Sequence, residues 1–436
     1  MNATLPVVPT PIPAMTDLVF AVTLALLLMA PLAIAGVALI NTGLGRSRSA
    51  AQALLGNLAM VAVATTVFAL FGAVLAGGLS GAGHVFHLAG KPWDWAGTGR
   101  LMLRGFSAAP AETQLELLFE FLAVALAALI PWGSGADRWR LTAGCASAAV
   151  FAGIVFPLTA HWIWGGGWLA QLSANFGLGA GFLDGGGAAT VHVAGGMSAL
   201  AVVWIAGPRK GKFPKEGFST AMPGHNAGYV LFGCLVCLMG WLGWNAAGAV
   251  LWLHAPLSAL PVTAVNTVLS ASAALLATFA VTRFRFGKPD ASLCANGWVA
   301  GLVASSGCAG MVTPGEAFFV GAMAGIATPL LVEVLELALS IDDPSGAITV
   351  HGVAGLWGLL AAGIFASQHG QFVAQLVGIA ALLGLVLPMV YLLFALLNRV
   401  VPFRVDADGE RIGMDLHELG GGAYPEFVIH RDESYR

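Results

Sequence analysis

Long apolar runs with few or no charged residues alternate along the chain with short polar connections. A helix needs about 20 apolar residues to cross the roughly 30 Å hydrocarbon core of a bilayer, so each run predicts one membrane span. We therefore predict an all-α polytopic membrane protein, with a transmembrane domain at residues 1–400 and a tail at 401–436. Its eleven predicted spans lie at residues 18–41, 51–77, 113–135, 141–162, 185–206, 225–252, 258–282, 293–312, 316–340, 347–368 and 373–398.

The positions of Lys and Arg test this count, because the cytoplasmic loops of membrane proteins carry an excess of both. With eleven spans, the connections after the odd-numbered spans lie on the same side as the tail, and 16 of the 19 Lys and Arg residues fall there. The opposite side holds Lys91, Arg100 and Arg104. We therefore predict an outer N-terminus and a cytoplasmic C-terminus in a cell (inner or plasma) membrane.

The composition changes this picture little but excludes several classes of protein. Hydrophobic residues make up 58% of the chain and charged residues 9%, against roughly 25% charged in ordinary soluble domains. The net charge of -3 offers no basic surface to nucleic acid. The five cysteines lie in apolar stretches and are interpreted as packing residues. The outer loop near 78–112 and the tail are too small for a catalytic domain, so we expect no enzyme, no catalytic residue and no cofactor.

Two segments of the chain share an unusual pattern. In each, an Asp is followed eight positions later by a His, which Thr-Val precedes and Ala-Gly closely follows: Asp184 with His192, and Asp343 with His351. The first segment opens the fifth predicted span and the second opens the tenth, from opposite sides of the membrane. Such a pair is typical of an inverted repeat, here of spans 1–5 and 6–10, and transporters place their sites where the repeats meet.

Helix geometry predicts where the two histidines lie. Eight residues at about 1.5 Å each advance a helix by about 12 Å, close to half of the roughly 30 Å core. His192 and His351 should therefore reach the midplane from opposite faces. Asp184 and Asp343, at the helix starts, are expected to cap free backbone N–H groups.

Two simpler interpretations of the histidines stay open alongside a pathway. The imidazoles could satisfy each other or a backbone carbonyl inside a packed bundle, or they could bind a metal. No Cys, Asp or Glu lies within a helical turn of either histidine, which argues against a metal site. Ionisable residues within membranes usually mark routes for solutes or protons, and two at matching depth favour that function.

Further segments, none decisive alone, occur in an order that is specific when taken together. They are His161–Trp168, Asp184–Gly195, Gly224–Gly228, Gly240–Asn245, Asp342–Pro344 leading to Val350–Gly352, and Gly413–His417 with Ala423 and Tyr424. With these segments the sequence resembles the ammonium transporter (Amt/Mep/Rh) family, closer to its Amt branch, from the first predicted span to the tail.

The resemblance implies a homotrimer in which each subunit has its own narrow apolar pore. It also implies that His192 and His351 are the twin histidines of the family, Asp184 its supporting aspartate, and Trp164 the tryptophan that meets the cation in an outer vestibule. In the family's mechanism, ammonium loses its proton and neutral ammonia crosses the pore. A bare charge at the bilayer centre costs at least about 3 kcal/mol, which disfavours passage of the intact ion.

Some positions depart from the family pattern. The two gate positions, usually stacked phenylalanines, hold Ala123 and Trp244, so we expect Trp244 alone to close the pore in a roughly volume-conserving exchange. Glu120 replaces the usual glutamine and either attracts cations or is a solvated carboxylate near a helix end. The predicted substrate pathway comprises His192, His351, Asp184, Trp164, Trp244, Ala123, Glu120, Phe119, Gly248, where a vestibule serine is usual, and Asn245; Asp343 is expected to be a structural cap.

These features predict transport of ammonium or ammonia as the function. An ammonium sensor on the same scaffold, reporting through the tail to a cytosolic partner, is the alternative. About 36 residues follow the last predicted span, which favours the transporter because a sensor usually needs an output domain. The resemblance also implies a small cytosolic regulator of the P-II type as a partner.

Overall fold

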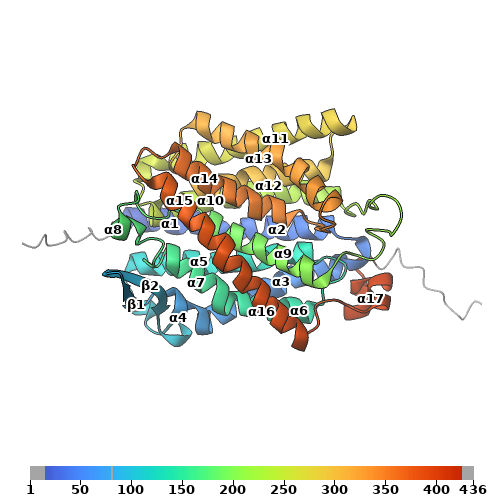
Figure 1. The fold of residues 1–436 in the computed structure, drawn as a ribbon, viewed down its shortest axis with the longest axis horizontal. Helices are drawn as coiled ribbons and strands as arrows, with labels where there is room; N and C mark the ends of the chain where they lie inside the picture. Colours follow the sequence, from blue (N-terminus) through green and yellow to red (C-terminus); the bar gives the residue numbers. More distant parts are fainter. Residues whose placement is uncertain (1–14, 80–81, 425–436) are drawn as a thin grey trace, which may run out of the picture.

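The structure is a computed structural model that describes residues 15–79 and 82–424. Expectations for the two ends of the chain, at residues 1–14 and 425–436, lie outside the described residues. The described chain forms one bundle of long helices running side by side (Figure 1). A β-hairpin lies at one end of the bundle and α17 at the opposite end, where it neighbours the cytoplasmic connections predicted from the sequence.

The helices have the following bounds in chain order. They are α1 (Asp17–Leu27), α2 (Ala30–Leu44), α3 (Ala50–Val67), α4 (Ala73–Ala76), α5 (Ala111–Ser134), α6 (Leu141–Val150), α7 (Phe156–Ile163), α8 (Leu172–Phe176), α9 (Ala194–Ala206), α10 (Ala227–Trp252), α11 (Leu260–Phe286), α12 (Ala291–Cys308), α13 (Pro314–Leu337), α14 (Ala354–Phe365), α15 (Gln371–Ala381), α16 (Leu387–Val400) and α17 (Ala407–Ile412). The hairpin consists of β1 (Ala82–Leu88) and β2 (Lys91–Thr98).

The predicted spans correspond to helices within a few residues at each end. In the described residues, ten helical stretches are long and apolar enough to cross a membrane. The remaining predicted span, the eighth, at 293–312, corresponds to α12, which packs against α10, α11, α13 and α14. α12 is less apolar because it carries polar side chains such as Asn296 and Ser305, both of which are buried. The prediction of a polytopic helical membrane protein is confirmed.

Several spans are not single regular helices. Pro31, near the start of α2, has no backbone N–H to donate, and the first span breaks between α1 and α2 just before it. π-helical turns join the parts of other spans, at Phe68–Gly72, Phe151–Val155 and Leu382–Val386. Two more π-helical turns, at Ala188–Val193 (η6) and Ile348–Val353 (η8), carry the two histidines. Such turns often mark functional sites.

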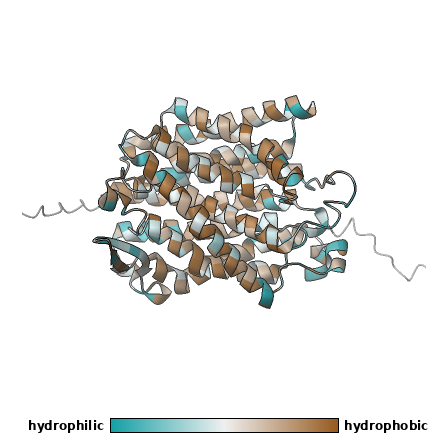
Figure 2. Cartoon of the chain, in the orientation of Figure 1, coloured by the Kyte–Doolittle hydropathy of each residue, from teal (hydrophilic) through white to brown (hydrophobic). Residues whose placement is uncertain are grey.

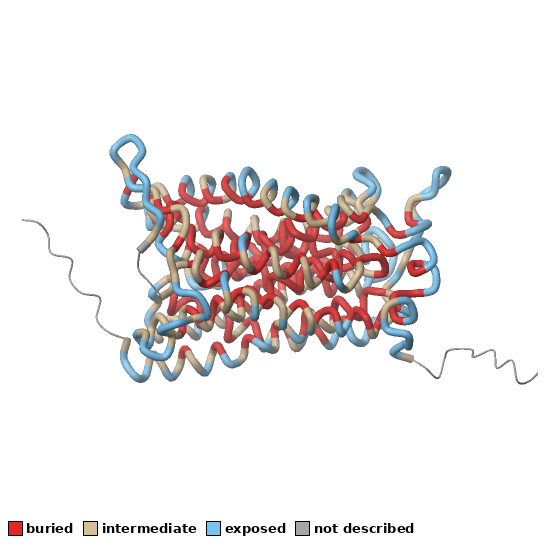
Figure 3. The backbone as a smooth tube through the Cα atoms, turned by 90° about the horizontal axis from the view of Figure 1, so that it is seen from below, coloured by how far each residue is buried: buried red, intermediate tan, exposed pale blue. Residues whose placement is uncertain are grey.

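Hydrophobic residues fill the middle of the bundle and hydrophilic ones gather at its two ends (Figure 2). Buried segments run through the centre of the bundle along its whole length (Figure 3). Large apolar side chains, among them Phe232, Leu235 and Leu392, are exposed on its flanks. A water-soluble protein would hide these side chains, whereas a bilayer accommodates them.

The outer loop near 78–112 contains a feature that the sequence did not predict. β1 and β2 pair antiparallel, with an irregularity between Gly83 and Val85. Trp95 of β2 stacks on Trp168, with ring centroids 5.3 Å apart. Asp94 of β2 lies 3.0 Å from Nε2 of the buried His161 on α7. The hairpin is therefore fixed to the helix that leads to Trp164.

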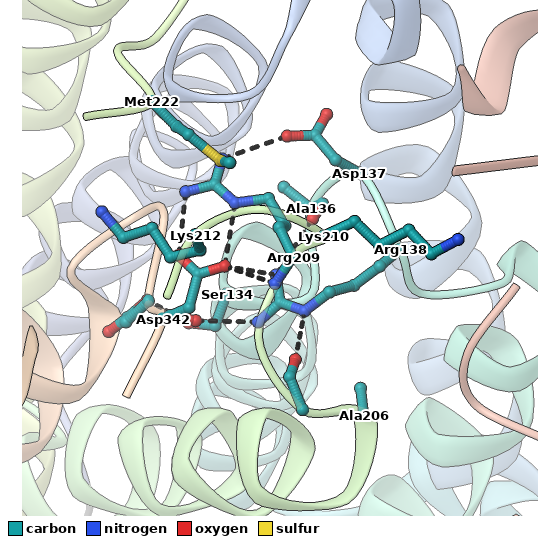
Figure 4. Close-up of polar contacts among 12 residues, drawn as sticks. Ser134, Ala136, Asp137, Arg138, Ala206, Arg209, Lys210, Lys212, Met222 and Asp342 are labelled. Carbon is teal, nitrogen blue, oxygen red and sulfur yellow. Dashed lines mark hydrogen bonds and ion pairs between the residues drawn. The ribbon is translucent and has the colours of Figure 1, made fainter. Parts of the chain in front are cut away.

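A group of ionic side chains joins the connections at the opposite end (Figure 4). The guanidinium of Arg209 donates to both carboxylate oxygens of Asp342, at 2.9 Å each, and to Asp137 at 3.1 Å. Arg138, which is fully buried, donates to the backbone carbonyl of Asp342 at 2.7 Å. Burial alone would raise the pKa of Asp342, but the hydrogen bonds from Arg209 and the charge of Arg138 outweigh it and lower this pKa to about 2.

The described part of the tail is docked on the same end of the bundle. Asp415 accepts hydrogen bonds from Ala51 N and Gln52 N, at 3.1 and 2.7 Å, in the first turn of α3. Glu418 accepts from Leu141 N, the first residue of α6, at 3.1 Å from each oxygen. These carboxylates satisfy backbone donors that a helix leaves free at its start, and they meet the positive end of its dipole.

Candidate functional site

The two histidines meet in the centre of the bundle. Nδ1 of His351 lies 3.2 Å from Nδ1 of His192, and the two ring centroids are 5.2 Å apart with the planes inclined by 24°. His192 is fully buried and His351 is 5% exposed. A Cβ on Gly196 would lie 2.4 Å from Gly352 N, so only glycine lets the two backbones approach this closely. The prediction that both histidines reach one place from opposite sides agrees with this geometry.

The contact between the histidines restricts where their protons lie. A hydrogen bond between two Nδ1 atoms requires one ring to donate and the other to accept. When both rings are neutral, the donating ring has a bare Nε2 and the accepting ring carries its proton on Nε2. Nε2 of His192 is buried without a partner among the described residues. The imidazoles therefore satisfy each other on one side, as the simpler interpretation held, and still offer a donor and an acceptor on the other.

The two repeated segments fold alike around their aspartates. Oδ2 of Asp184 accepts from Ala189 N and Thr190 N at 3.1 and 3.0 Å, and Oδ2 of Asp343 accepts from Ile348 N at 2.8 Å. η6 packs against α14 and η8 against α9, so each histidine segment contacts the helix that follows the other one. This reciprocal packing is the arrangement that an inverted repeat requires.

The two copies differ in one hydroxyl group. Thr190 Oγ1 donates to Asp184 at 3.1 Å, whereas Thr349 Oγ1, at the same place in the second copy, is buried with no partner among the described residues. Asp343 Oδ1 accepts a hydrogen bond from Ser134 Oγ instead, at 2.7 Å. Thr349 lines a cavity of about 560 Å³ at the cytoplasmic end, together with Asp343. This cavity therefore comes within two residues of His351.

Trp241 and Trp252, which the sequence analysis did not single out, stack on candidate site residues. Trp241 stacks on His192, with ring centroids 5.2 Å apart and planes inclined by 10°. Trp252 stacks on Trp164 at 5.0 Å and 7°. Trp241 and Trp252 lie three residues before and eight residues after Trp244 on α10. Their spacing from Trp244 could have identified them from the sequence, since residues three, four and eight apart share a helix face.

Trp244, which the sequence analysis expects to close the pore alone, packs against a second ring. Phe119, one helical turn before Ala123 on α5, packs on Trp244 with ring centroids 4.3 Å apart. Phe119 also contacts Trp164 edge-on at 5.3 Å, and both Phe119 and Ala123 are fully buried. Phe119 therefore places a ring beside Trp244 on the face of α5 that also carries Ala123, because residues four apart lie on one helix face.

A second cavity, of about 530 Å³, lies at the outer end of the bundle. Trp164, Trp252 and Glu120 belong to its wall. The indole nitrogen of Trp164 donates to the backbone carbonyl of Asp184 at 2.7 Å, which fixes the ring. Trp244 is fixed in the same way by the carbonyl of Gly186, at 2.8 Å. One short segment before η6 therefore fixes the indole of Trp164 in the cavity wall and the indole of Trp244 beneath it.

Gly248 and Asn245, both expected on the pathway, are closely packed. A Cβ on Gly248 would lie 2.0 Å from Gly185 O, so the backbone occupies the place of a serine side chain there. Asn245 donates to Thr267 Oγ1 and Ser305 Oγ, at 3.0 and 2.9 Å, and accepts from Ser306 Oγ. Its polar atoms therefore join α10 to α11 and α12.

Among the described residues, no group of three or more His, Cys, Asp or Glu side chains could hold a metal ion. The five cysteines are free thiols, and four of them are buried. Cys237 contacts the backbone of α2, where a Cβ on Gly36 would lie 2.5 Å from its sulfur. The site therefore consists of two imidazoles, a row of aromatic rings and the carboxyl groups of the two repeated segments, with a cavity at either end.

Known proteins share both the sequence and this fold. The model of the Ammonium Transporter Family matches residues 19–424. Ammonium transporter Amt2 of Archaeoglobus fulgidus is 34% identical, over 92% of this chain and 86% of its own. The ammonium transporter of Bacillus subtilis is 29% identical, over 94% and 99%.

Solved structures agree. A structure titled as a sensor Amt protein superimposes with a TM-score of 0.82 at 26% identity, over 92% of this chain and 97% of its own. Mep2 of Candida albicans, at 23% identity, shares the fold with a TM-score of 0.76, over 94% and 90%. The chain therefore belongs to the ammonium transporter family, and it is a multi-pass cell-membrane protein that transports ammonium and is not an enzyme.

Proposed function

We propose that ammonium enters the outer cavity as a cation, loses its proton above the Phe119–Trp244 pair, and crosses as ammonia past His192 and His351. The indole faces of the outer cavity suit a cation, since cation–π attraction contributes about 0.5 to 2 kcal/mol. Below them the rings of Phe119 and Trp244 leave little space for a hydration shell, as both side chains are at most 1% exposed. An intact ion would therefore lose its water without replacement.

The contact between the histidines is the observation that carries this proposal. Because each Nδ1 is engaged with the other, the pair presents one Nε2–H and one bare Nε2. Ammonia can donate a hydrogen bond to the bare Nε2 and accept one from the Nε2–H. These two bonds replace the hydrogen bonds with water that ammonia loses on entering the pore. A potassium ion finds no acceptor cage here and cannot shed a proton to become neutral.

Replacing His192 tests the route. We expect His192→Ala, in liposomes, to abolish ammonium-specific currents recorded by solid-supported-membrane electrophysiology, with potassium pulses as the reference ion. His225→Ala is a matched control, because His225 lies outside the bundle centre and contacts Gly45 O and Tyr424. Undiminished ammonium signals in a folded His192→Ala protein would contradict the route.

An ammonium sensor is the second candidate function. Two observations favour it: the similar solved protein is titled as a sensor, and the Phe119–Trp244 pair is tight, with ring centroids 4.3 Å apart. Tight binding of ammonium by purified protein, with neither current nor ammonia flux, would support sensing. Flux above that of empty liposomes would support the transporter.

We infer further that three copies assemble and that a P-II-type regulator docks on the cytoplasmic face. The family supports the trimer, and the exposed apolar flanks provide surface for it. The docked tail and the basic connections around Arg209 support a regulatory partner at that face. Native mass spectrometry of the detergent-solubilised protein tests the first inference: three subunits per particle are expected, and a monomer at all concentrations would overturn it.

A further inference from the structure

Three glutamates occupy every fourth position near the start of α5: Glu112, Glu116 and Glu120. Residues four apart lie on one face of a helix, so the three carboxyl groups form a row along it. Glu112 and Glu116 are half-buried, whereas Glu120 is 4% exposed. Glu116 and Glu120 both line the outer cavity. The row therefore leads from the outer end of α5 toward the bottom of that cavity.

One oxygen of Glu120 has no protein partner. Its Oε2 atom is buried and makes no hydrogen bond with any described residue. A Cβ on Gly78, which belongs to the same cavity wall, would lie 4.0 Å from this oxygen. Arg100 is the positively charged residue of the wall, and it is exposed and forms no ion pair with Glu120 in the described chain. A buried carboxylate without a partner binds a cation or a proton strongly.

The surroundings of Glu120 suit an ammonium ion. Trp164 and Trp252 present stacked indoles to the same cavity. Phe119, the preceding residue, packs on Trp164, Trp252 and Trp244. α4 contributes the backbone around Ala76 and Gly77, without a charged side chain. Glu120 is thus the most deeply buried ionisable group of the cavity and adjoins the aromatic closure.

We propose that Glu120 accepts the proton of ammonium at the bottom of the outer cavity, a step that rests on the proposed passage of ammonia. One N–H bond breaks, and its electron pair stays on nitrogen, which leaves as neutral ammonia. The proton forms an O–H bond with the carboxylate of Glu120. Glu120 then returns this proton to water in the cavity or to Glu116, four residues earlier, and is ready for the next ion.

The pH dependence of transport distinguishes this role from simple attraction of cations. Glu120 works as a carboxylate, so wild-type kcat should fall as the outer pH is lowered and the carboxyl becomes protonated before ammonium arrives. In Glu120→Gln, kcat should fall about 100-fold, a typical contribution of general acid–base catalysis, and the acid limb should disappear. Glu120→Asp should restore part of the rate and the acid limb.

The contrary results are equally clear. An unchanged kcat and pH profile in Glu120→Gln would overturn the proposal. A raised KM with unchanged kcat would also overturn it, because Glu120 would then only attract the cation. Glu216→Gln, in an exposed cytoplasmic loop, is the matched control and should behave as wild type. Size-exclusion profiles and circular dichroism establish that each variant is folded.

Infrared difference spectroscopy tests the step without requiring transport. Adding ammonium to purified wild-type protein should produce the carbonyl stretch of a protonated carboxyl group, and potassium should not. The band should be absent in Glu120→Gln and shifted in Glu120→Asp. If the wild type shows no flux but gives this band, the transport route fails and the role of Glu120 stands. If flux is present and the band is absent, the role of Glu120 fails and the transport route stands.

Discussion

At the scale of single residues, main-chain carbonyls fix two of the aromatic rings along the pathway. Trp164 donates to Asp184 O and Trp244 to Gly186 O, at 2.7 and 2.8 Å. An indole held by its N–H in a packed site has little freedom to rotate, because breaking the bond would bury an unpaired donor. These two rings therefore act as fixed walls, whereas Phe119 carries no polar group and has no such anchor.

Removing either ring of the Phe119–Trp244 pair should open the closure. In Phe119→Ala and Trp244→Ala, we expect potassium pulses to produce current, since water can follow the ion into the space left by the ring. The double variant should add little to either single one, because the rings are in contact. Phe121→Ala is the matched control, because Phe121 lies on the same helix but packs on Phe68. If only Trp244→Ala, and not Phe119→Ala, shows a potassium current, the result would support closure by Trp244 alone.

The sequence was informative about residues wherever spacing determines position. The eight-residue step from Asp184 to His192, repeated from Asp343 to His351, predicted the meeting of the histidines. Phe119 was among the predicted pathway residues, but its packing on Trp244 was not predicted, because the family pattern placed the second ring at position 123. The packing at Gly248 was not predicted for another reason: it depends on how closely α10 approaches Gly185, a distance that no sequence pattern states.

At the scale of elements, helix starts on the cytoplasmic side depend on carboxylates from far along the chain. Ser49 precedes α3 but makes no side-chain cap, and Arg140 precedes α6 with none. Asp415 and Glu418 of the tail provide these hydrogen bonds instead. The sequence predicted the spans from their hydrophobic runs, but it could not reveal these caps, because their partners are hundreds of residues apart.

Replacing Asp415 should loosen the tail and the first turn of α3 together. We expect Asp415→Ala to cost about 1 kcal/mol of local stability, the usual value of a lost N-terminal cap. Hydrogen–deuterium exchange should then be faster in residues 47–55 and 407–419. Asp408→Ala is the control, because the side chain of Asp408 is 86% exposed and pairs only with Arg411 among described residues. Exchange in α3 that matches wild type would show that the cap does not stabilise this turn.

At the scale of the whole molecule, the cytoplasmic end is held by charge and the membrane-spanning part by close packing. Arg209 and Arg138 connect the loops around Asp137 and Asp342, and all four side chains are at most 4% exposed. These loops follow the third and fifth spans and precede the tenth. The ionic group therefore joins the two halves of the inverted repeat at one end of the bundle.

Acid should weaken this junction. The pKa of Asp342 is lowered to about 2, from an ordinary value of 3.8, so its ion pair contributes fully above about pH 4 and is lost as the pH falls through 2. The shift corresponds to about 2 kcal/mol. We expect the thermal midpoint of purified wild-type protein to fall between pH 4 and 2, and Asp342→Asn to be less stable at pH 7 with a flatter acid limb.

A parallel acid limb in wild type and Asp342→Asn would assign the loss to other carboxyl groups. Glu333→Gln is the comparison variant, because Glu333 forms a half-exposed ion pair with Arg285. Exposed pairs contribute at most about 1 kcal/mol. The thermal midpoint of Glu333→Gln should therefore stay close to that of wild type at every pH.

The docked tail also sets an order for events during biosynthesis. Gln52 and Asp415 are 363 positions apart, and Leu141 and Glu418 are 277 apart. At about 5 to 20 residues per second, a ribosome needs tens of seconds to make the later partner. For that time the early helices sit in the membrane with bare amide ends at the cytosolic surface. A nascent chain that stops before position 415 leaves these amides unpaired, so the starts of α3 and α6 are capped only once the tail has been made.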